Sequence, residues 1–466
     1  MEGREQCGHS GESSRAKTVA SSHDGSSRVI NVVFLMLLID LLGFTLILPL
    51  LPSILDYYGK TDQDDSYRVL QRSVDWFADV IGVPSVRKYN TVLFGGLIGS
   101  IFSVLQFLVS PVTGAASDYF GRRILMMVTM AGLLVSYALW ALSRNFGIFL
   151  LSRVVGGISK GNVSLSTAII ADLPSPQARS KGMAMVGVAF SLGFTIGPMI
   201  GAFLGMRAGK DEAFYLQPAL LAMALVVSDL LFVFFFLPET LPREKRISSV
   251  SSIFQNAVNL LSPVALFQFS AIQQRKDSPS PEGMKALKVL GLVYFLYLFL
   301  FSGLEYTLSF LTHQRFHFDS MQQGKMFFFV GITMAIVQGG YARRIKPGNE
   351  VKAVKRAISL LIPGFLIIGW TSSVMLLYIG LLFYSCAAAV VIPCLSAVVA
   401  GYGAANQKGT VMGILRSLGA LARALGPTLA ATVYWLGGAE LCFTMAAAGF
   451  LLPLALISVP KAKKRE

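Results

Sequence analysis

The amino-acid sequence predicts an all-helical integral membrane protein with twelve transmembrane helices in two pseudo-symmetric six-helix bundles. Three observations lead to this fold class: an apolar composition, the number of apolar stretches of bilayer length, and a repeat between the two halves. Of 466 residues, 54% are hydrophobic and 14% are charged, and the mean hydropathy is +0.62. A soluble domain of this length could not hide so much apolar surface from water. The lipid bilayer is therefore the first predicted partner.

The net charge of +15 has two interpretations. A basic chain can bind nucleic acid, but here Lys and Arg form short clusters between apolar stretches, as they do in cytoplasmic loops. We predict a topology signal and no nucleic-acid partner. The four cysteines lack the spacing of a metal site or disulfide framework, and no nucleotide-binding loop or activated nucleophile is recognisable. We therefore expect no cofactor, no metal and no enzymatic activity.

Stretches of bilayer length account for most of the chain, since a spanning helix needs about 20 mostly apolar residues. The twelve predicted spans are 29–51, 92–115, 124–142, 146–171, 182–204, 216–237, 289–311, 324–341, 357–370, 374–400, 409–436 and 442–459. They predict a first bundle over residues 29–238 with a long outer loop at 52–91. A middle loop at 239–288 then precedes a second bundle over 289–459.

The basic clusters orient these bundles. They lie in the N-terminal tail (1–28), the middle loop, the basic C-terminal tail (460–466) and the loops after the second, fourth and eighth spans. Because such clusters stay in the cytoplasm, both termini are predicted to be cytoplasmic. Apolar residues at helical spacing in the outer loop predict a helical cap over the outer mouth. The plasma membrane is the expected location, with an internal membrane such as the nuclear envelope as the alternative.

The two halves repeat one pattern. Lys181-Gly182 precedes Ser-Leu-Gly at 191–193 and Gly197-Pro198 in the fifth span, and Lys408-Gly409 precedes the same triplet at 417–419 and Gly426-Pro427 in the eleventh. Duplicated halves are the usual architecture of secondary transporters. Gly197 and Pro198 are expected to bend their helix during gating, although such pairs are also common in passive packing.

A short polar loop between the second and third spans contains Gly114, Asp118, Gly121, Arg122 and Arg123. Apolar segments flank it, so its charges must lie at the membrane interface, where Asp118 can pair with a cation and join two helices. We predict that this loop is a latch, with Asp118 and Arg122 clamping the cytoplasmic side. The corresponding loop of the second half (339–344) has two arginines but no acid, so closure is expected to depend mainly on the first half.

Charged residues inside the predicted spans are candidates for the transport site, since each costs about 2.5 to 3.5 kcal/mol on insertion scales. They are Asp40, Arg153, Lys160, Asp229, Glu305, Arg416 and Arg423. Arg416 and Arg423 are seven residues apart, so both project from nearly the same helix face, about 10 Å apart. Arg153 and Lys160 repeat this spacing on the fourth span. The sequence therefore predicts cations on two opposite walls of a cavity.

Cations among apolar side chains suit an amphipathic organic anion, because guanidinium and ammonium groups replace the hydration that the anion loses. The carboxyl groups suit coupling to a proton, with Asp40 as the first candidate and Glu305 as the second. Structural roles compete with these interpretations. Arg153 could be an ion-pair partner, Asp229 a bridge between helices, and Arg416 with Arg423 a balance for Glu305.

Several motifs resemble the major facilitator superfamily, in the order expected for that family. The latch loop is similar to its signature between the second and third spans. Further resemblances, to its drug antiporters and the bacterial tetracycline-resistance proteins among them, lie at Asp40–Gly43, Pro49–Pro52, Leu150–Gly157, Gly193–Gly201 and Pro238–Thr240. The fifth-span motif departs from the family pattern, with Ala184 and Ala202 in place of glycines.

Residues 76–78, 157–167 and 301–316 resemble more closely one vertebrate member of that superfamily, an antiporter of organic anions. The resemblance extends over residues 29–459 and implies a monomeric secondary transporter that works by alternating access on a small molecule. We therefore expect an organic-anion antiporter, with a proton as the candidate coupling ion. The alternative is a membrane receptor or scaffold that keeps the fold without transporting. Such a protein would need neither Asp40 nor Arg153 nor the latch.

Overall fold

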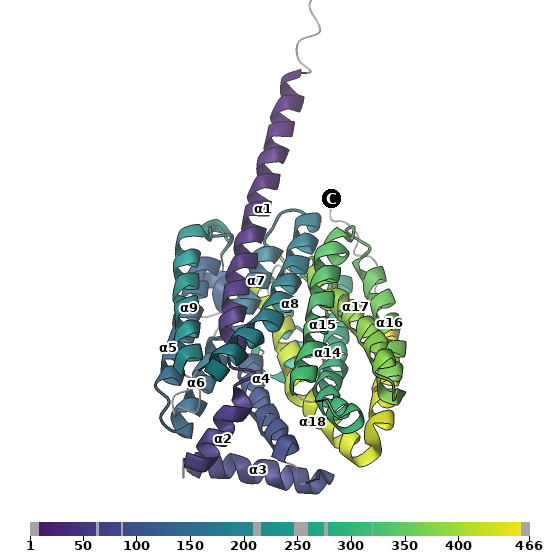
Figure 1. The fold of residues 1–466 in the computed structure, drawn as a ribbon. Helices are drawn as coiled ribbons and strands as arrows, with labels where there is room; N and C mark the ends of the chain where they lie inside the picture. The colour runs from purple at the N-terminus through teal and green to yellow at the C-terminus, as the bar shows by residue number, and fades with distance from the viewer. Residues whose placement is uncertain are drawn as a thin grey trace, which may run out of the picture.

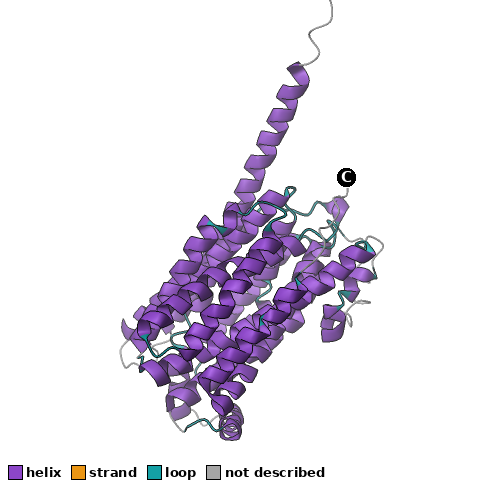
Figure 2. Cartoon of the chain, turned by 90° about the vertical axis from the view of Figure 1, so that its right-hand side faces the viewer, coloured by secondary structure: helices purple, strands orange, loops and turns teal. Residues whose placement is uncertain are grey.

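The computed structural model describes residues 9–61, 65–84, 87–207, 216–246, 260–274, 278–318 and 320–457, and these contain helices but no strands. Long helices run side by side through the molecule (Figure 1, Figure 2). The first half contains α1 (His9–Thr45), α2 (Leu51–Thr61), α3 (Asp65–Ile81), α4 (Arg87–Phe120), α5 (Arg122–Ala141), α6 (Phe146–Ser159), α7 (Asn162–Ala171), α8 (Pro176–Arg207) and α9 (Leu216–Phe236).

The second half follows a connection with three short helical turns, η1 (Arg243–Lys245), α12 (Pro263–Phe267) and α13 (Ser270–Gln273). It contains α14 (Pro281–Phe316), α15 (Ser320–Gly340), η2 (Ala342–Arg344), α16 (Glu350–Trp370), α17 (Val374–Val399), α18 (Lys408–Gly449) and α19 (Leu451–Leu456). The predicted all-helical fold is therefore confirmed.

Ten helical segments of the described residues are long and apolar enough to cross a bilayer. Two differences reconcile this number with the twelve predicted spans, all of which fall on helices. The ninth span is α16, which is not among the ten and whose first turns carry Glu350, Lys352, Lys355 and Arg356. The eleventh and twelfth are joined in α18, which is interrupted at Gly438, where φ is 84° and ψ is 168°.

Several predicted boundaries differ from the structure. Helix α1 begins at His9, so most of the predicted tail 1–28 continues the first span, and it ends at Thr45 instead of residue 51. The polar loop 114–123 is mostly helix. Residues up to Phe120 form the last turns of α4, and only Gly121, with φ at 98°, separates them from α5. The fourth span is broken into α6 and α7.

The two bundles meet along two matched helix pairs, α4 with α18 and α8 with α15. The sequence repeat has a counterpart within each bundle. A Cβ on Gly197 of α8 would overlap the Thr45 hydroxyl of α1, and a Cβ on Gly426 of α18 would overlap the Phe299 carbonyl of α14. In both halves the Gly-Pro pair thus lets the fifth helix pack tightly against the first, which supports the predicted duplication. Gating by Gly197 and Pro198 stays a prediction.

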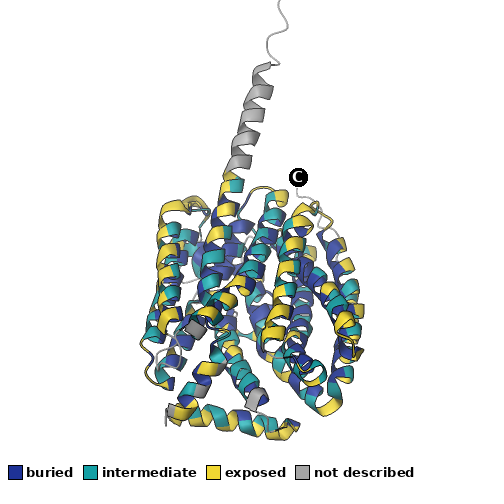
Figure 3. Cartoon of the chain, in the orientation of Figure 1, coloured by how far each residue is buried: buried dark blue, intermediate teal, exposed yellow. Residues whose placement is uncertain are grey.

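Buried residues face the inside of the bundles and exposed residues cover the periphery (Figure 3). Large apolar side chains are exposed on that periphery, such as Phe235 on α9 (70%) and Ile336 on α15 (67%), as lipid contact requires. Helix α3 lies across one end of the molecule, with Val74 and Ile81 buried (Figure 1). We call this the cap end, and the opposite end, where α4 turns into α5, the latch end.

Candidate functional site

Asp118 at the end of α4 connects the first bundle to the second. Its carboxylate accepts hydrogen bonds from the backbone N–H groups of Gly409 (2.9 Å) and Thr410 (2.8 Å) and from the Thr410 hydroxyl (2.6 Å). These residues form the first turn of α18, where free N–H groups and the helix dipole favour a negative charge. Asp118 was predicted to pair with a cation, and it also binds the N-terminus of a helix in the other bundle. The backbones of α4 and α18 approach so closely here that a Cβ on Gly114 would overlap the Gly409 carbonyl.

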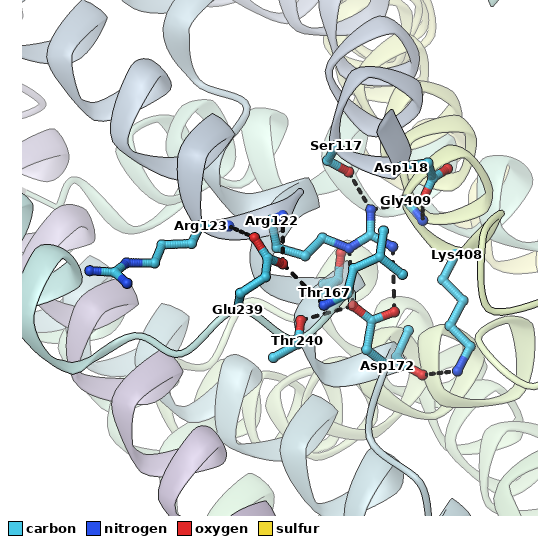
Figure 4. A network of polar contacts seen from close by, with 12 residues as sticks. Ser117, Asp118, Arg122, Arg123, Thr167, Asp172, Glu239, Thr240, Lys408 and Gly409 are labelled. Carbon is cyan, nitrogen blue, oxygen red and sulfur yellow. Dashed lines mark hydrogen bonds and ion pairs between the residues drawn. The ribbon is translucent and has the colours of Figure 1, made fainter. Parts of the chain in front are cut away.

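Arg122 completes this latch from the start of α5 (Figure 4). Its buried guanidinium pairs with Asp118 at 2.8 Å and with Asp172, which follows α7, at 3.0 Å. Asp172 also accepts a hydrogen bond from the Thr240 hydroxyl at 2.9 Å. Burial raises the pKa of the Asp172 carboxyl, and the Arg122 guanidinium opposes that rise. Three elements of the first bundle and one of the second are thus held by one buried charge network.

Arg123 contributes to the latch through its backbone. The N–H groups of Arg122 (3.0 Å) and Arg123 (3.3 Å) donate to Glu239, whose carboxylate also pairs with Arg246 at 3.2 Å. The Arg123 side chain points away to the carbonyl and ring of Phe234. Sequence reasoning gave Asp172 and Glu239 no role. The Pro238–Thr240 motif was a signal for Glu239, whereas Asp172 stands out only by its position at the end of a span.

The corresponding place in the second half is η2, where Arg343 and Arg344 are exposed. Arg122 in contrast is completely buried. The two halves therefore differ at this end as predicted, with a buried acid and base in the first half and solvent-facing arginines in the second.

Asp40 and Lys160 form a buried ion pair at 2.6 Å within the first bundle. Lys160 lies at the break between α6 and α7, and its ammonium group is 4.6 Å from the centre of the Phe44 ring on α1. Each charge thus has a partner on a neighbouring helix.

Arg153 contacts a different helix from Lys160, in contrast to the predicted row of cations on the fourth span. Its buried guanidinium lies over the rings of Trp140 on α5 (5.3 Å) and Phe149 (5.6 Å), and its Nη2 atom has no hydrogen-bond partner. The difference arises because the helix ends at Ser159, so the seven-residue spacing no longer places both side chains on one face. Arg153 therefore packs inside the first bundle.

Arg416 and Arg423 lie on α18, and Arg416 reaches across to the first bundle. Arg416 lies 5.6 Å from the centre of the Phe190 ring on α8, across the interface, and both arginines interact with Tyr294 of α14. Gly419, between them, leaves room for the Tyr294 ring, which a Cβ would approach to 2.9 Å. The Nε atom of Arg416 and the Nη2 atom of Arg423 have no hydrogen-bond partner. The predicted shared face is present and has free donors.

Glu305 and Asp229, the two other acids in the spans, have opposite surroundings. Glu305 of α14 is exposed although it lies mid-helix, and its polar neighbours are Tyr384 of α17 and Arg423. Asp229 of α9 is fully buried, and neither carboxyl oxygen has a hydrogen-bond partner. A bridge between helices, one of its two predicted roles, is therefore not formed by a hydrogen bond in the described part of the chain.

Residues 33–427 match the Major Facilitator Superfamily. The chain belongs to this superfamily. Its family and fold are those of multi-pass membrane transporters and not of enzymes. Among the residues that the structure describes, no group of three or more His, Cys, Asp or Glu side chains could hold a metal ion.

Within the Major Facilitator Superfamily the chain is similar to a vertebrate protein. It is 62% identical to human major facilitator superfamily domain-containing protein 10 over 430 residues, which cover 92% of each chain. The mouse protein of the same name is 61% identical with the same coverage. The resemblance noted at residues 76–78, 157–167 and 301–316 is thus confirmed. The class D tetracycline resistance protein of Salmonella ordonez is 26% identical over 86% of this chain and 89% of its own.

Solved structures agree with this assignment. The crystal structure of the human organic anion transporter MFSD10 (TETRAN) matches with a TM-score of 0.89 and 61% identity, over 93% of this chain and 99% of that one. The proton:xylose symporter XylE matches with a TM-score of 0.63 and 16% identity, over 93% of this chain and 97% of its own, which shows the shared fold alone.

Proposed function

We propose that this transporter carries organic anions and binds them at Arg416 and Arg423. The observation that carries the proposal is the pair of guanidinium groups with unpartnered nitrogen atoms, of which Arg416 lies at the interface between the bundles. Buried donors without acceptors are costly, and hydrogen bonds from charged donors to an anion contribute about 1.5 to 3 kcal/mol each. A carboxylate or sulfonate would satisfy these donors. The human relative described as an organic anion transporter, at 61% identity, supports this substrate class.

The surroundings of the two arginines suit an amphipathic substrate. Phe190 lies under Arg416, and the Tyr294 ring packs between the two arginines. Lys160, with Phe44 beside it, is also within electrostatic range of Arg416 from the first bundle. An apolar body could therefore lie against aromatic rings while its charged group binds the arginines.

Alternating access would move this site between the two sides of the membrane. The buried contacts of Asp118 with α18 support a closed latch end, and the basic clusters of the sequence support a cytoplasmic location for it. Antiport, the predicted mode, requires two ligands to compete for one site. Two anions would compete for the same arginines, so exchange of one anion for another is the form of antiport that this site favours.

The test is uptake of an organic anion into liposomes that contain the purified protein. We expect the double variant R416Q/R423Q to lower the initial uptake of a fluorescent aryl sulfonate by about tenfold or more, since charged hydrogen bonds are lost. The matched control is R343Q/R344Q, which removes two exposed arginines of η2 and should retain uptake. Undiminished uptake by R416Q/R423Q would refute the site. A wild-type protein that transports no anion would support the receptor or scaffold alternative.

A further inference from the structure

The surroundings of Glu305 suggest how a proton could influence the anion site. Of the three carboxyl groups inside the spans, Asp40 is buried in an ion pair with Lys160 and Asp229 is completely buried, whereas Glu305 is exposed. Glu305 is therefore the most accessible of these three acidic residues and the best candidate for proton exchange.

The ionisable neighbours of Glu305 come from three helices of the second bundle. Tyr384 comes from α17, Arg423 from α18, and Tyr297 from the same helix, α14. Arg423 interacts with Glu305 and Tyr294, whereas Arg416 interacts with Arg423 and Tyr294. The site thus contains two cations and one carboxyl group. The carboxyl group of Glu305 interacts with Arg423, which is also one of the two cations that would bind the anion.

We propose that Glu305 binds a proton together with the organic anion, so that the two cross the membrane in the same direction. The inference rests on the proposed function of Arg416 and Arg423. An ionised Glu305 neutralises Arg423 and repels a second negative charge beside it. When Glu305 is protonated, its charge is removed and Arg423 is free to bind the anion. The proton is taken up by a carboxylate oxygen on one side and released from it on the other.

Thermodynamic linkage fixes the sign of this coupling. If protonation strengthens anion binding by some factor, the bound anion strengthens proton binding by the same factor, which is typically about 5-fold to 150-fold for coupled sites. Co-binding drives anions from the more acidic side to the less acidic side. This is the opposite of a proton antiporter, in which the proton and the substrate compete.

The experiment uses the full-length protein in liposomes and a fluorescent aryl sulfonate, which stays anionic throughout the pH range used. We expect an acid-outside gradient of about one pH unit to raise initial uptake several-fold, and an acid-inside gradient to lower it. The variant E305Q should lose the response to the gradient, so that its uptake is the same with and without the pH difference. E305D, which keeps a carboxyl group, should retain it.

The matched control is E282Q, the same substitution at an exposed position in the first turn of α14. It should leave the response to the gradient unchanged. Stimulation of wild-type uptake by an acid interior, or a full response to the gradient in E305Q, would overturn the inference while leaving the anion site intact. Absence of sulfonate uptake by the wild-type protein would instead refute the proposed function and this inference together.

A binding measurement covers the case in which E305Q does not fold. Stabilisation of the detergent-purified wild-type protein by the sulfonate, read as the shift in its thermal unfolding temperature, should increase as the pH falls. A shift that is constant or decreases with acidification would overturn the inference.

Discussion

The cations of the first bundle and those of α18 differ in how their charge is compensated. Lys160 pairs with Asp40, and Arg122 pairs with Asp118 and Asp172, so these charges are satisfied by the protein itself. Arg416 and Arg423 have nitrogen atoms without partners, and Arg416 contacts Phe190 across the interface between the bundles. The difference teaches that charges inside a span can have different roles. We propose that donors without partners near the interface indicate the substrate site better than position inside a span does.

Arg153 shows why both conditions are needed. Its Nη2 atom has no hydrogen-bond partner, yet its guanidinium is buried over two aromatic rings within one bundle. Stacking on aromatic rings partly compensates the charge. We therefore propose a packing role for Arg153 and a binding role for the α18 pair.

The largest expected effect is on stability, at the paired charges. K160A removes the partner of Asp40 and leaves a buried carboxylate, which should destabilise the protein by about 3 to 5 kcal/mol because the remaining charge is unpaired. The variant D40N/K160A removes both charges and should recover much of this loss. Thermal unfolding of the purified variants measures both changes. Equal stability of K160A and the wild type would show that this pair is not structural.

A smaller effect is expected at the latch. D118N retains a side-chain oxygen but loses the charge that faces the N-terminus of α18 and Arg122, which should weaken the closed latch end by about 1 to 3 kcal/mol. Transport requires the protein to alternate between a state closed at the latch end and a state closed at the cap end. Because D118N weakens the first of these states, we expect uptake to fall by about tenfold while the protein remains in the membrane. R343Q/R344Q is again the control. Normal uptake by D118N would contradict the role of the latch.

The sequence predicted the order of the helices because apolar length alone identifies a span. It also identified the shared face of Arg416 and Arg423, since seven residues on an uninterrupted helix make nearly two full turns. The same reasoning failed for Arg153 and Lys160, because the helix breaks after Ser159 and periodicity does not carry across a break.

Partners across helices were harder to predict than positions along them. Nothing in the sequence paired Asp40 with Lys160, which are 120 residues apart, or Asp118 with the N–H groups of Gly409 and Thr410. Such contacts depend on how the bundles pack. The exposure of Glu305 and the burial of Asp229 likewise follow from tertiary structure, because both residues lie in long apolar stretches of sequence.

Direct binding of the aryl sulfonate tests the central claim, that the α18 arginines with unpartnered nitrogen atoms form the anion site. Affinity should be measured by titration calorimetry on the purified wild type, R416Q/R423Q and R153K. We expect the affinity of R416Q/R423Q for the aryl sulfonate to fall by about tenfold or more, whereas R153K should bind it as the wild type does. Unchanged affinity in R416Q/R423Q, with a loss in R153K, would contradict it.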